Sequence, residues 1–230
     1  MYLRHHHQKI TKAGRKQQRG GNKLMRKEIK VPYINQSPDY PTGCETISAM
    51  MYLRFLGIDV DIRDFIDNYL KKDWFEEKDG VTYGPDPNIA FVGSPYDSNS
   101  FGCFPKVIIK ALAAYFAKKK LPYEAMEVSH KDTEELVSEY IDKNVPVLYW
   151  TGIDMLPARE GPSWILKDSG EKYTWISNEH CLLLVGHDGD KLIAADPWNG
   201  NGIKDYPRED MIRGHREHGE GAIVILEKDL

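Results

Sequence analysis

The 230-residue sequence predicts an α+β fold, because helical patterns come first and strand patterns come late. Apolar residues recur with helical spacing up to residue 143, and short apolar runs of the strand type follow from residue 145 to residue 227. Such a segregation is typical of helices packed on an antiparallel sheet. The 41% hydrophobic content allows a sizeable core, so we expect a single domain over residues 31–230.

The first helix is predicted to begin at Gly43. Thr42, followed three residues later by Glu45, has the pattern of a capping box. A broad apolar face follows, and Gly57 is placed to end the helix in a left-handed conformation. Cys44 therefore falls in the first turn of a buried helix.

A thiol in the first turn of a helix is a candidate nucleophile. Unpaired backbone N–H groups and the positive end of the helix dipole favour an anion there. We therefore expect the pKa of Cys44 to lie below the ordinary thiol value of about 8.5. The alternative is that Cys44 is a small buried hydrophobic residue, which is the usual state of a free cysteine.

The remaining helices and strands follow from caps and apolar spacing. Pro105 suits the first turn of a helix, and Asp132 with Glu135 has the capping-box pattern. The predicted helices cover residues 61–70, 104–120 and 132–143, and the predicted strands cover residues 145–150 and 222–227.

A second candidate site element is a hairpin around the sequence Asp-Gly-Asp at residues 188–190. With a three-residue loop, His180 pairs with Trp198 and Leu182 pairs with Asp196. His180 and Asp196 are then diagonal neighbours on one face. A two-residue loop would place them on opposite faces, so the prediction depends on the longer turn.

In this register, His180 can accept the thiol proton through one ring nitrogen while Asp196 orients the ring through the other. Cys181, one residue further along the strand, points to the opposite face and is expected in the core. His187 is expected to be a polar residue at the strand end.

Three segments resemble a known family. Residues 31–57, 86–105 and 180–198 are similar to the papain-like cysteine peptidase domains related to bacteriocin-processing, double-glycine peptidases. The similarity covers roughly residues 31–227, and its motifs are a Gln ahead of a Gly-Cys-Glu helix start and a His strand followed by Asp-Pro-Trp.

The resemblance implies a papain-like fold without a cofactor or metal. It implies that Cys44 is the nucleophile, His180 the general base and acid, and Asp196 the orienting group. It also implies that Gln36 donates to the oxyanion hole, although a polar residue of a Pro-rich loop is an alternative for Gln36. The implied reaction is hydrolysis of a peptide or amide through an acyl-enzyme.

Two other functions stay open. The same thiol could pass its acyl group to an amine, or the fold could be a catalytically silent peptide-binding module. The sequence carries no transporter region, so a double-glycine leader cannot be assumed as the substrate.

Two long segments are expected to form the walls of a substrate groove. Residues 72–103 are rich in Gly, Pro, Asp, Ser and Asn, and residues 151–177 precede His180 and contain several aromatic residues. The candidate substrate contacts are Gly43, Asn88, Gly102, Glu179 and Trp198.

Charge divides the chain. Residues 1–30 hold ten Lys or Arg and one acidic residue, which leaves 21 basic and 34 acidic residues for residues 31–230. We expect residues 1–30 to be a flexible tail that could touch an anionic surface. Nucleic-acid binding is not expected, because the tail lacks interleaved aromatic residues and a binding motif.

Other classes of protein are disfavoured. No apolar run approaches the roughly 18 residues of a membrane span, and no apolar segment of signal-peptide length follows the basic start. Three cysteines do not suggest a disulfide framework, and their spacing from the histidines does not suggest zinc. We expect a monomer that acts on a peptide or protein, in a compartment that the sequence leaves open.

Overall fold

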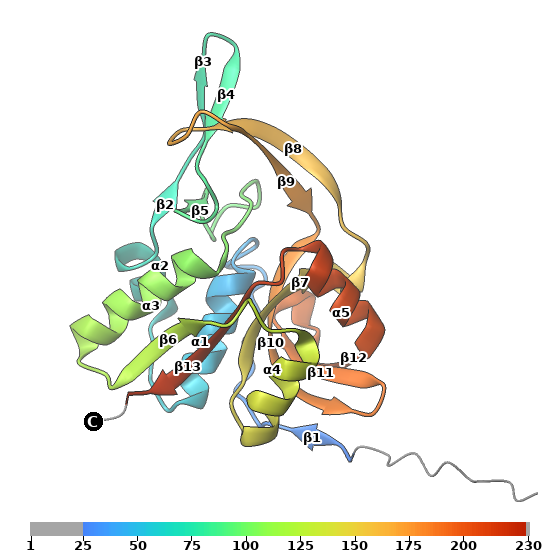
Figure 1. The fold of residues 1–230 in the computed structure, drawn as a ribbon. Coiled ribbons are helices and arrows are strands. Elements are labelled where there is room, and N and C mark those ends of the chain that lie inside the picture. Colours follow the sequence, from blue (N-terminus) through green and yellow to red (C-terminus); the bar gives the residue numbers. More distant parts are fainter. Residues whose placement is uncertain (1–24, 229–230) are drawn as a thin grey trace, which may run out of the picture.

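The structure, a computed structural model, describes residues 25–228 and consists of helices packed around a large sheet (Figure 1). The expected α+β fold class is confirmed. No helix among these residues is long and apolar enough to cross a bilayer. The helices are α1 (Cys44–Phe55), α2 (Ile62–Asn68), α3 (Pro105–Lys119), α4 (Thr133–Glu139) and α5 (Arg208–Glu217), with short 3-10 turns η1 (Ile141–Lys143), η2 (Ile153–Met155) and η3 (Trp198–Gly200).

The main sheet has seven strands in the order β12-β11-β10-β7-β13-β6, with β1 added against β10. All of its pairings are antiparallel. Strand β7 is buried along its whole length and carries no charged residue. The strands are β1 (Lys27–Glu28), β6 (Tyr123–Glu127), β7 (Val147–Gly152), β10 (Glu179–Asp188), β11 (Lys191–Asp196), β12 (Gly202–Pro207) and β13 (Ala222–Glu227).

Helix α1 is a core helix that is fixed to two strands. Its first ten residues are all buried, which is typical of a helix surrounded by protein. Ser48 donates from Oγ to the Cys181 carbonyl of β10 at 3.1 Å, and the Tyr52 hydroxyl donates to the Ile225 carbonyl of β13 at 3.1 Å. These contacts hold the helix, and therefore Cys44, in a fixed position on the sheet.

The start of α1 differs from the prediction, because Thr42 and Glu45 do not form a capping box. The N-cap is Gly43 and receives no side-chain hydrogen bond. The Thr42 hydroxyl instead lies 3.1 Å from the Ser94 carbonyl and 3.0 Å from the Asp97 carbonyl of another loop. Thr42 and Glu45 therefore make hydrogen bonds to distant parts of the chain instead of capping the helix.

The other helix termini agree with the sequence. The Asp61 side chain caps α2, Pro105 is the first residue of α3, and Asp132 with Glu135 forms the predicted capping box of α4. Gly57 follows α1 with φ +77°, as expected for a left-handed helix end.

Strands β10 and β11 form the predicted hairpin, but the three-residue turn was wrong. Asp188 pairs with Lys191, so the turn has two residues, and Gly189 takes φ +60° within it. A regular ladder from this turn would place His180 and Asp196 on opposite faces.

A β-bulge in β10 restores the predicted register. Leu184 pairs with Ala194, whereas Gly186 pairs with Ile193, so one residue of β10 is left over between them. Beyond the bulge Leu183 pairs with Ala195, which is the register that the three-residue turn would have produced. The bulge therefore offsets the error in the turn.

The two segments predicted as loops contain short strands. Strands β2 (Lys72–Asp73) and β5 (Phe91–Val92) pair in parallel, and a four-stranded sheet has the order β3-β4-β8-β9. Figure 1 shows this second sheet projecting from the main body, and we call it the arm. Its strands are β3 (Glu76–Lys78), β4 (Val81–Gly84), β8 (Arg159–Leu166) and β9 (Lys172–Ser177).

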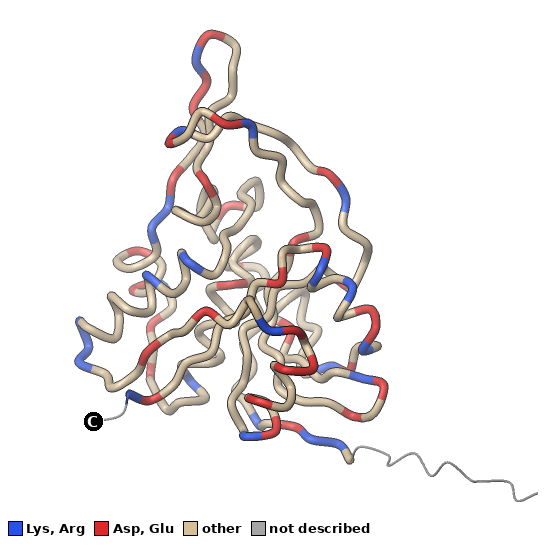
Figure 2. The backbone as a smooth tube through the Cα atoms, in the orientation of Figure 1, with Lys and Arg blue, Asp and Glu red and all other residues tan. Residues whose placement is uncertain are grey.

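The first strand, β1, lies before residue 31, the predicted domain boundary. Strand β1 pairs with β10, and Arg26 binds Asp205 of β12 at 2.9 Å. Figure 2 shows basic and acidic residues interspersed along the outer segments. The predicted flexible tail and its anionic contacts concern mainly residues 1–24, which lie outside the described residues.

Candidate active site

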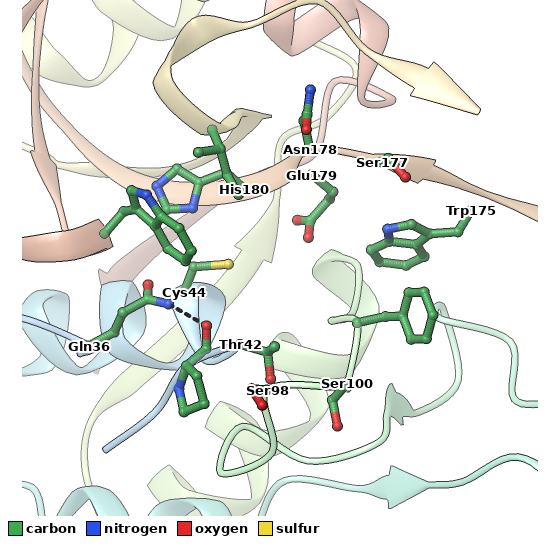
Figure 3. A pocket seen from close by; sticks show the side chains of 14 residues that line it. Gln36, Thr42, Cys44, Ser98, Ser100, Trp175, Ser177, Asn178, Glu179 and His180 are labelled. Carbon is green, nitrogen blue, oxygen red and sulfur yellow. Dashed lines mark hydrogen bonds between the residues drawn. The ribbon is translucent and has the colours of Figure 1, made fainter. Parts of the chain in front are cut away.

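A pocket of about 390 Å³ opens between the start of α1, the start of β10 and the loop before α3 (Figure 3). Segments far apart in the sequence meet in this pocket, as the predicted site requires. Its lining includes Gln36, Cys44, Phe101, Trp175, Glu179 and His180.

Cys44 is only 6% exposed at the base of the pocket. Its thiol donates to Oε2 of Glu45 at 3.3 Å, and within residues 25–228 it makes no hydrogen bond with His180. Burial, together with the carboxyl groups of Glu45 and Glu179, raises the pKa of Cys44 well above its usual value. The sequence predicted that the N-terminus of α1 lowers the pKa of Cys44. This prediction was wrong for the resting state, because burial and the nearby carboxyl groups have a larger effect than the helix dipole.

His180 and Asp196 form a buried pair. Nε2 of His180 lies 2.7 Å from Oδ1 of Asp196, and the two side chains are 1% and 0% exposed. Nδ1 of His180 makes no hydrogen bond with any described residue and is the nitrogen left for a reacting group. The predicted diagonal contact is therefore present.

Asp196 is held as an anion by four donors. Oδ1 also accepts from the Trp198 backbone N–H at 2.9 Å, and Oδ2 accepts from Asn201 at 2.9 Å and from the Tyr206 hydroxyl. Burial alone would raise the pKa of Asp196, but the His180 ring and these donors lower it below the usual range. The sequence analysis missed Asn201 and Tyr206. The signal available for Tyr206 was its place on the strand that follows the His-Asp hairpin.

Gln36 is buried beside Cys44 but is turned partly into its own loop. Nε2 donates to the Pro41 carbonyl at 3.1 Å, as the dashed line in Figure 3 shows, and Oε1 has no partner among the described residues. The second hydrogen of the amide remains free to donate. The Gln36 backbone N–H donates to the Pro197 carbonyl at 3.0 Å, which ties this loop to the end of β11.

The sequence profile of the Peptidase_C39 like family matches residues 28–222. The chain belongs to the Peptidase_C39 like family. This result confirms the family resemblance seen in the sequence, and the family and fold are those of C39-type cysteine peptidases.

Two solved structures were compared with this chain. The crystal structure of a candidate C39-like peptidase from Bacillus anthracis has a TM-score of 0.75 and 28% identity, over 89% of this chain and 99% of that chain. A double glycine motif protease from an AMS/PCAT transporter, solved in complex with the leader peptide, gives a TM-score of 0.46 and 15% identity, over 89% and 95%. No curated protein matches the chain.

Only some of the candidate substrate contacts of this C39-like chain line the pocket. Glu179 and Trp198 line the pocket with Cys44. Gly43 is the N-cap of α1, and a Cβ at this position would lie 3.0 Å from Cβ of Tyr40 and 3.2 Å from Cβ of Pro95. Asn88 lines a separate hollow with Phe104 and binds Asp86 through both of its N–H groups, so the structure does not place it in the pocket.

Gly102 has a packing role that the sequence did not indicate. A Cβ at this position would lie 2.4 Å from Oε1 of Glu45 and 3.0 Å from Oε2 of Glu179. Glycine therefore allows two carboxyl groups to approach the backbone next to Cys44. Glu45 already binds Cys44 and the Cys103 N–H, and we assign no metal to the cluster.

The remaining cysteines and His187 are not among the residues that line the pocket. Cys103 and Cys181 are fully buried, and none of the cysteines forms a disulfide. The core position expected for Cys181 is confirmed. His187 binds Asp142 at 2.9 Å and takes no part in the pocket of the C39-like site.

Proposed function

We propose that this protein is a thiol-dependent peptide or amide hydrolase that uses Cys44, His180 and Asp196. The observation that supports it best is the 2.7 Å contact between His180 and Asp196 at a pocket that also contains Cys44 and Gln36. Membership of a peptidase family supports the same reaction class.

In this proposal the Cys44 proton moves to Nδ1 of His180, and the sulfur attacks the substrate carbonyl carbon. The free amide hydrogen of Gln36 and the Cys44 backbone N–H receive the oxyanion. The imidazolium protonates the leaving amine as the C–N bond breaks, which leaves a thioester on Cys44. His180 then removes a proton from water as the water oxygen attacks the thioester carbon. The C–S bond breaks, the acid is released, and the proton returns from His180 to the sulfur of Cys44.

Asp196 keeps its negative charge through the cycle, because its donors stabilise the carboxylate. It fixes the ring of His180 and stabilises the imidazolium. Catalytic hydrogen bonds are often long or poorly aligned in unliganded enzymes and tighten only when substrate binds. The contact of Cys44 with Glu45 is therefore compatible with a reactive state.

A quenched fluorescent peptide library tests the proposal, with Cys44→Ser and His180→Ala as loss variants and Cys103→Ser as the control. We expect cleavage by the native chain and by C103S only, with mass spectrometry showing the addition of water. Products that carry an added amine would show acyl transfer instead. Binding of peptides that is unaffected by C44S, without any turnover, would identify a silent binding module.

A further inference from the structure

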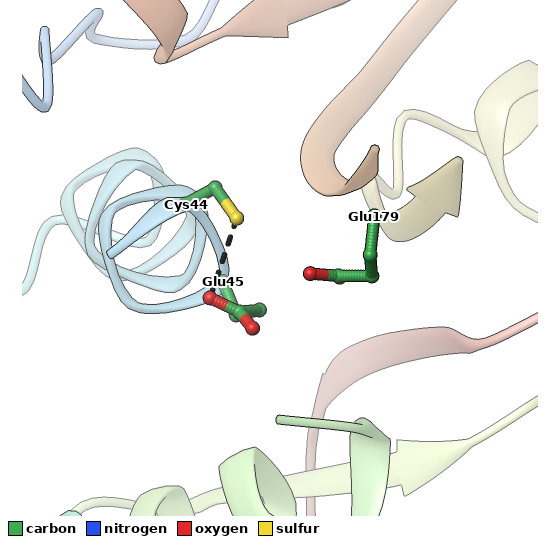
Figure 4. Close-up of side chains that lie close together, drawn as sticks. All are labelled: Cys44, Glu45 and Glu179. Carbon is green, nitrogen blue, oxygen red and sulfur yellow. Dashed lines mark hydrogen bonds between the residues drawn. The ribbon is translucent and has the colours of Figure 1, made fainter. Parts of the chain in front are cut away.

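Two buried carboxyl groups lie beside the proposed nucleophile (Figure 4). Glu45 is 0% exposed and Glu179 is 8% exposed. Their oxygens and the Cys44 sulfur lie within 4.8 Å of one another, and Figure 4 shows Glu179 reaching from the start of β10 towards α1. Acidic side chains are seldom buried without a cation, because removing a carboxylate from water costs free energy. The burial of two such groups beside Cys44 therefore points to a role for them.

The two carboxyl groups are held differently. Oε1 of Glu45 accepts the Cys103 backbone N–H at 2.6 Å, and Oε2 accepts the Cys44 thiol at 3.3 Å. Oε1 of Glu179 is buried and has no partner among the described residues. Glu45 is therefore the oriented acceptor of the thiol, and Glu179 is its unpartnered neighbour.

No lysine or arginine of residues 25–228 forms a salt bridge with Glu45 or Glu179. The imidazole of His180 also lies near Glu45. Burial raises the pKa of Glu45 to about 7, although the hydrogen bond from the Cys103 backbone N–H acts to lower it. Burial and Glu45 together raise the pKa of Glu179 well above its usual value. The other titratable or charged groups around the pair are Cys44 on α1, Cys103 before α3, Cys181 on β10, Tyr173 on β9, and Arg216, Glu217 and His218 at the end of α5.

Two carboxyl groups at this distance do not both ionise in a buried site. Glu179 therefore keeps its proton while Glu45 changes state near neutral pH. An ionised Glu45 accepts the S–H group and repels a thiolate. A protonated Glu45 does neither, and its O–H can donate to the sulfur.

We propose that Glu45 is a positioning residue that holds Cys44 as a neutral thiol in the resting enzyme, and that protonation of Glu45 releases Cys44 to His180. The inference rests on the proposed function, in which Cys44 is the nucleophile and His180 its base. The proton of Cys44 passes to Nδ1 of His180, and the proton that Glu45 takes up comes from solvent.

The pH dependence of Cys44 alkylation by neutral iodoacetamide tests this directly in the native chain, with peptide mapping to identify the site. An ordinary thiol loses about tenfold in rate for each pH unit below its pKa. We expect the Cys44 rate instead to rise as the pH falls through about 7. A flat or falling rate over pH 8 to 6 would overturn the proposal, and this measurement needs no variant to fold.

Two isosteric variants separate the two acids. Glu45→Gln is expected to remove the step near neutral pH and to raise the alkylation rate at pH 7.5 by about tenfold or more, since each unit of lowered thiol pKa gives tenfold more thiolate. Glu179→Gln is the matched control. Its alkylation rate should still change near neutral pH, because Glu179 stays protonated between pH 8 and pH 6. The reverse result, with the step lost only in E179Q, would contradict the role of Glu45.

His180→Ala distinguishes a failure of this inference from a failure of the proposed function. If His180 is the base, H180A slows alkylation of Cys44 at every pH, whatever Glu45 does. An unchanged rate in H180A would refute the catalytic pair itself. A slow H180A together with an unchanged E45Q would refute only the role of Glu45. Cys103 remains unreactive throughout in a folded chain because it is fully buried.

Discussion

Gln36 is the residue whose proposed role depends most on the family resemblance, and its geometry makes that role testable. One amide hydrogen is used by Pro41 and the other is free beside Cys44. If the free hydrogen receives the oxyanion, Gln36→Ala lowers kcat by about 10²–10³-fold with little change in KM, since the interaction exists only in the transition state.

Gln36→Glu is the sharper companion variant, because it keeps the size of the side chain and removes the donor. It should lose as much kcat as Q36A in steady-state assays on the best library peptide. Full activity in Q36E would show that Gln36 only supports the loop that it shares with Pro41.

His215 is a buried histidine that the proposed reaction does not use. It stacks on Tyr149 at 3.9 Å, and its Nδ1 donates to the Trp150 carbonyl at 2.7 Å. Burial lowers its pKa to about 4 from the usual 6.5. The neutral ring therefore stabilises the fold above pH 6.5, and this contribution is lost as the pH falls towards about 4.

Urea unfolding between pH 7 and pH 4 measures this effect. We expect the native chain to lose up to about 3 kcal/mol from His215 alone over that range. His215→Asn can keep the donor to Trp150 but cannot titrate, so its loss of stability should be smaller by that amount. Parallel pH curves for the two proteins would contradict the assignment.

At the scale of the helix, the two candidate capping boxes had different outcomes. Asp132 caps α4 as predicted, so Asp132→Ala should lower the free energy of unfolding by about 1 kcal/mol, within the usual 0.5–2. Ser138→Ala on the exposed face of the same helix is the control and should change little. Equal losses in chemical denaturation would argue against the cap.

At the scale of the strand, Gly186 lets β1 approach β10 closely, next to the bulge. A Cβ at this position would lie 2.1 Å from the Lys27 carbonyl oxygen of β1. Gly186→Ala should therefore displace β1 and cost about 1–3 kcal/mol, with faster hydrogen exchange at Ile29, whose N–H binds the Val185 carbonyl at 2.8 Å.

Gly189→Ala is the matched comparison within the same hairpin. Gly189 has φ +60° and no heavy atom within 4 Å of an added Cβ. The substitution should cost about 1 kcal/mol of backbone strain without faster exchange at Ile29. Similar exchange in the two variants would mean that the close approach of β1 to Gly186 has no structural effect.

Local patterns predicted those elements whose causes are local. The helices after Asp61 and Asp132 begin where their caps indicate, and Gly57 ends α1. The bulge in β10 was not predictable from the turn residues, because the extra residue lies several positions away from the turn. The raised pKa of Cys44 was not predictable either, because its main cause is burial in the folded chain, and Glu179, which adds to the shift, belongs to a distant segment.

At the scale of the whole molecule, the arm explains why residues 72–103 and 151–177 looked like loops. Its strand β4 pairs with β8, and these strands come from segments about eighty residues apart. These short strands lack the alternation of apolar and polar residues that predicts a strand, because packing between aromatic side chains holds them together. A small core separate from the main one contains Val92, Trp164, Leu166 and Trp175.

Trp164 connects the arm to the pocket. It packs on Phe75 at 5.0 Å and on Phe101 at 5.4 Å, and its indole N–H donates to the Pro85 carbonyl at 3.0 Å. Phe101 and Trp175 of the same cluster line the pocket of Cys44. The packing of the arm therefore determines the shape of the outer wall of the site.

Trp164→Leu should loosen the arm without reaching the catalytic pair. We expect faster limited proteolysis within residues 72–103 and 151–177, and a KM raised by about tenfold, equivalent to about 1.4 kcal/mol of lost substrate contact. The alkylation rate of Cys44 by iodoacetamide should stay the same, because so small a reagent needs no outer wall. Trp74→Leu is the matched control, since Trp74 is 53% exposed and lies between β2 and β3. If W164L and W74L have the same KM and the same proteolysis rates, the arm does not form part of the substrate site.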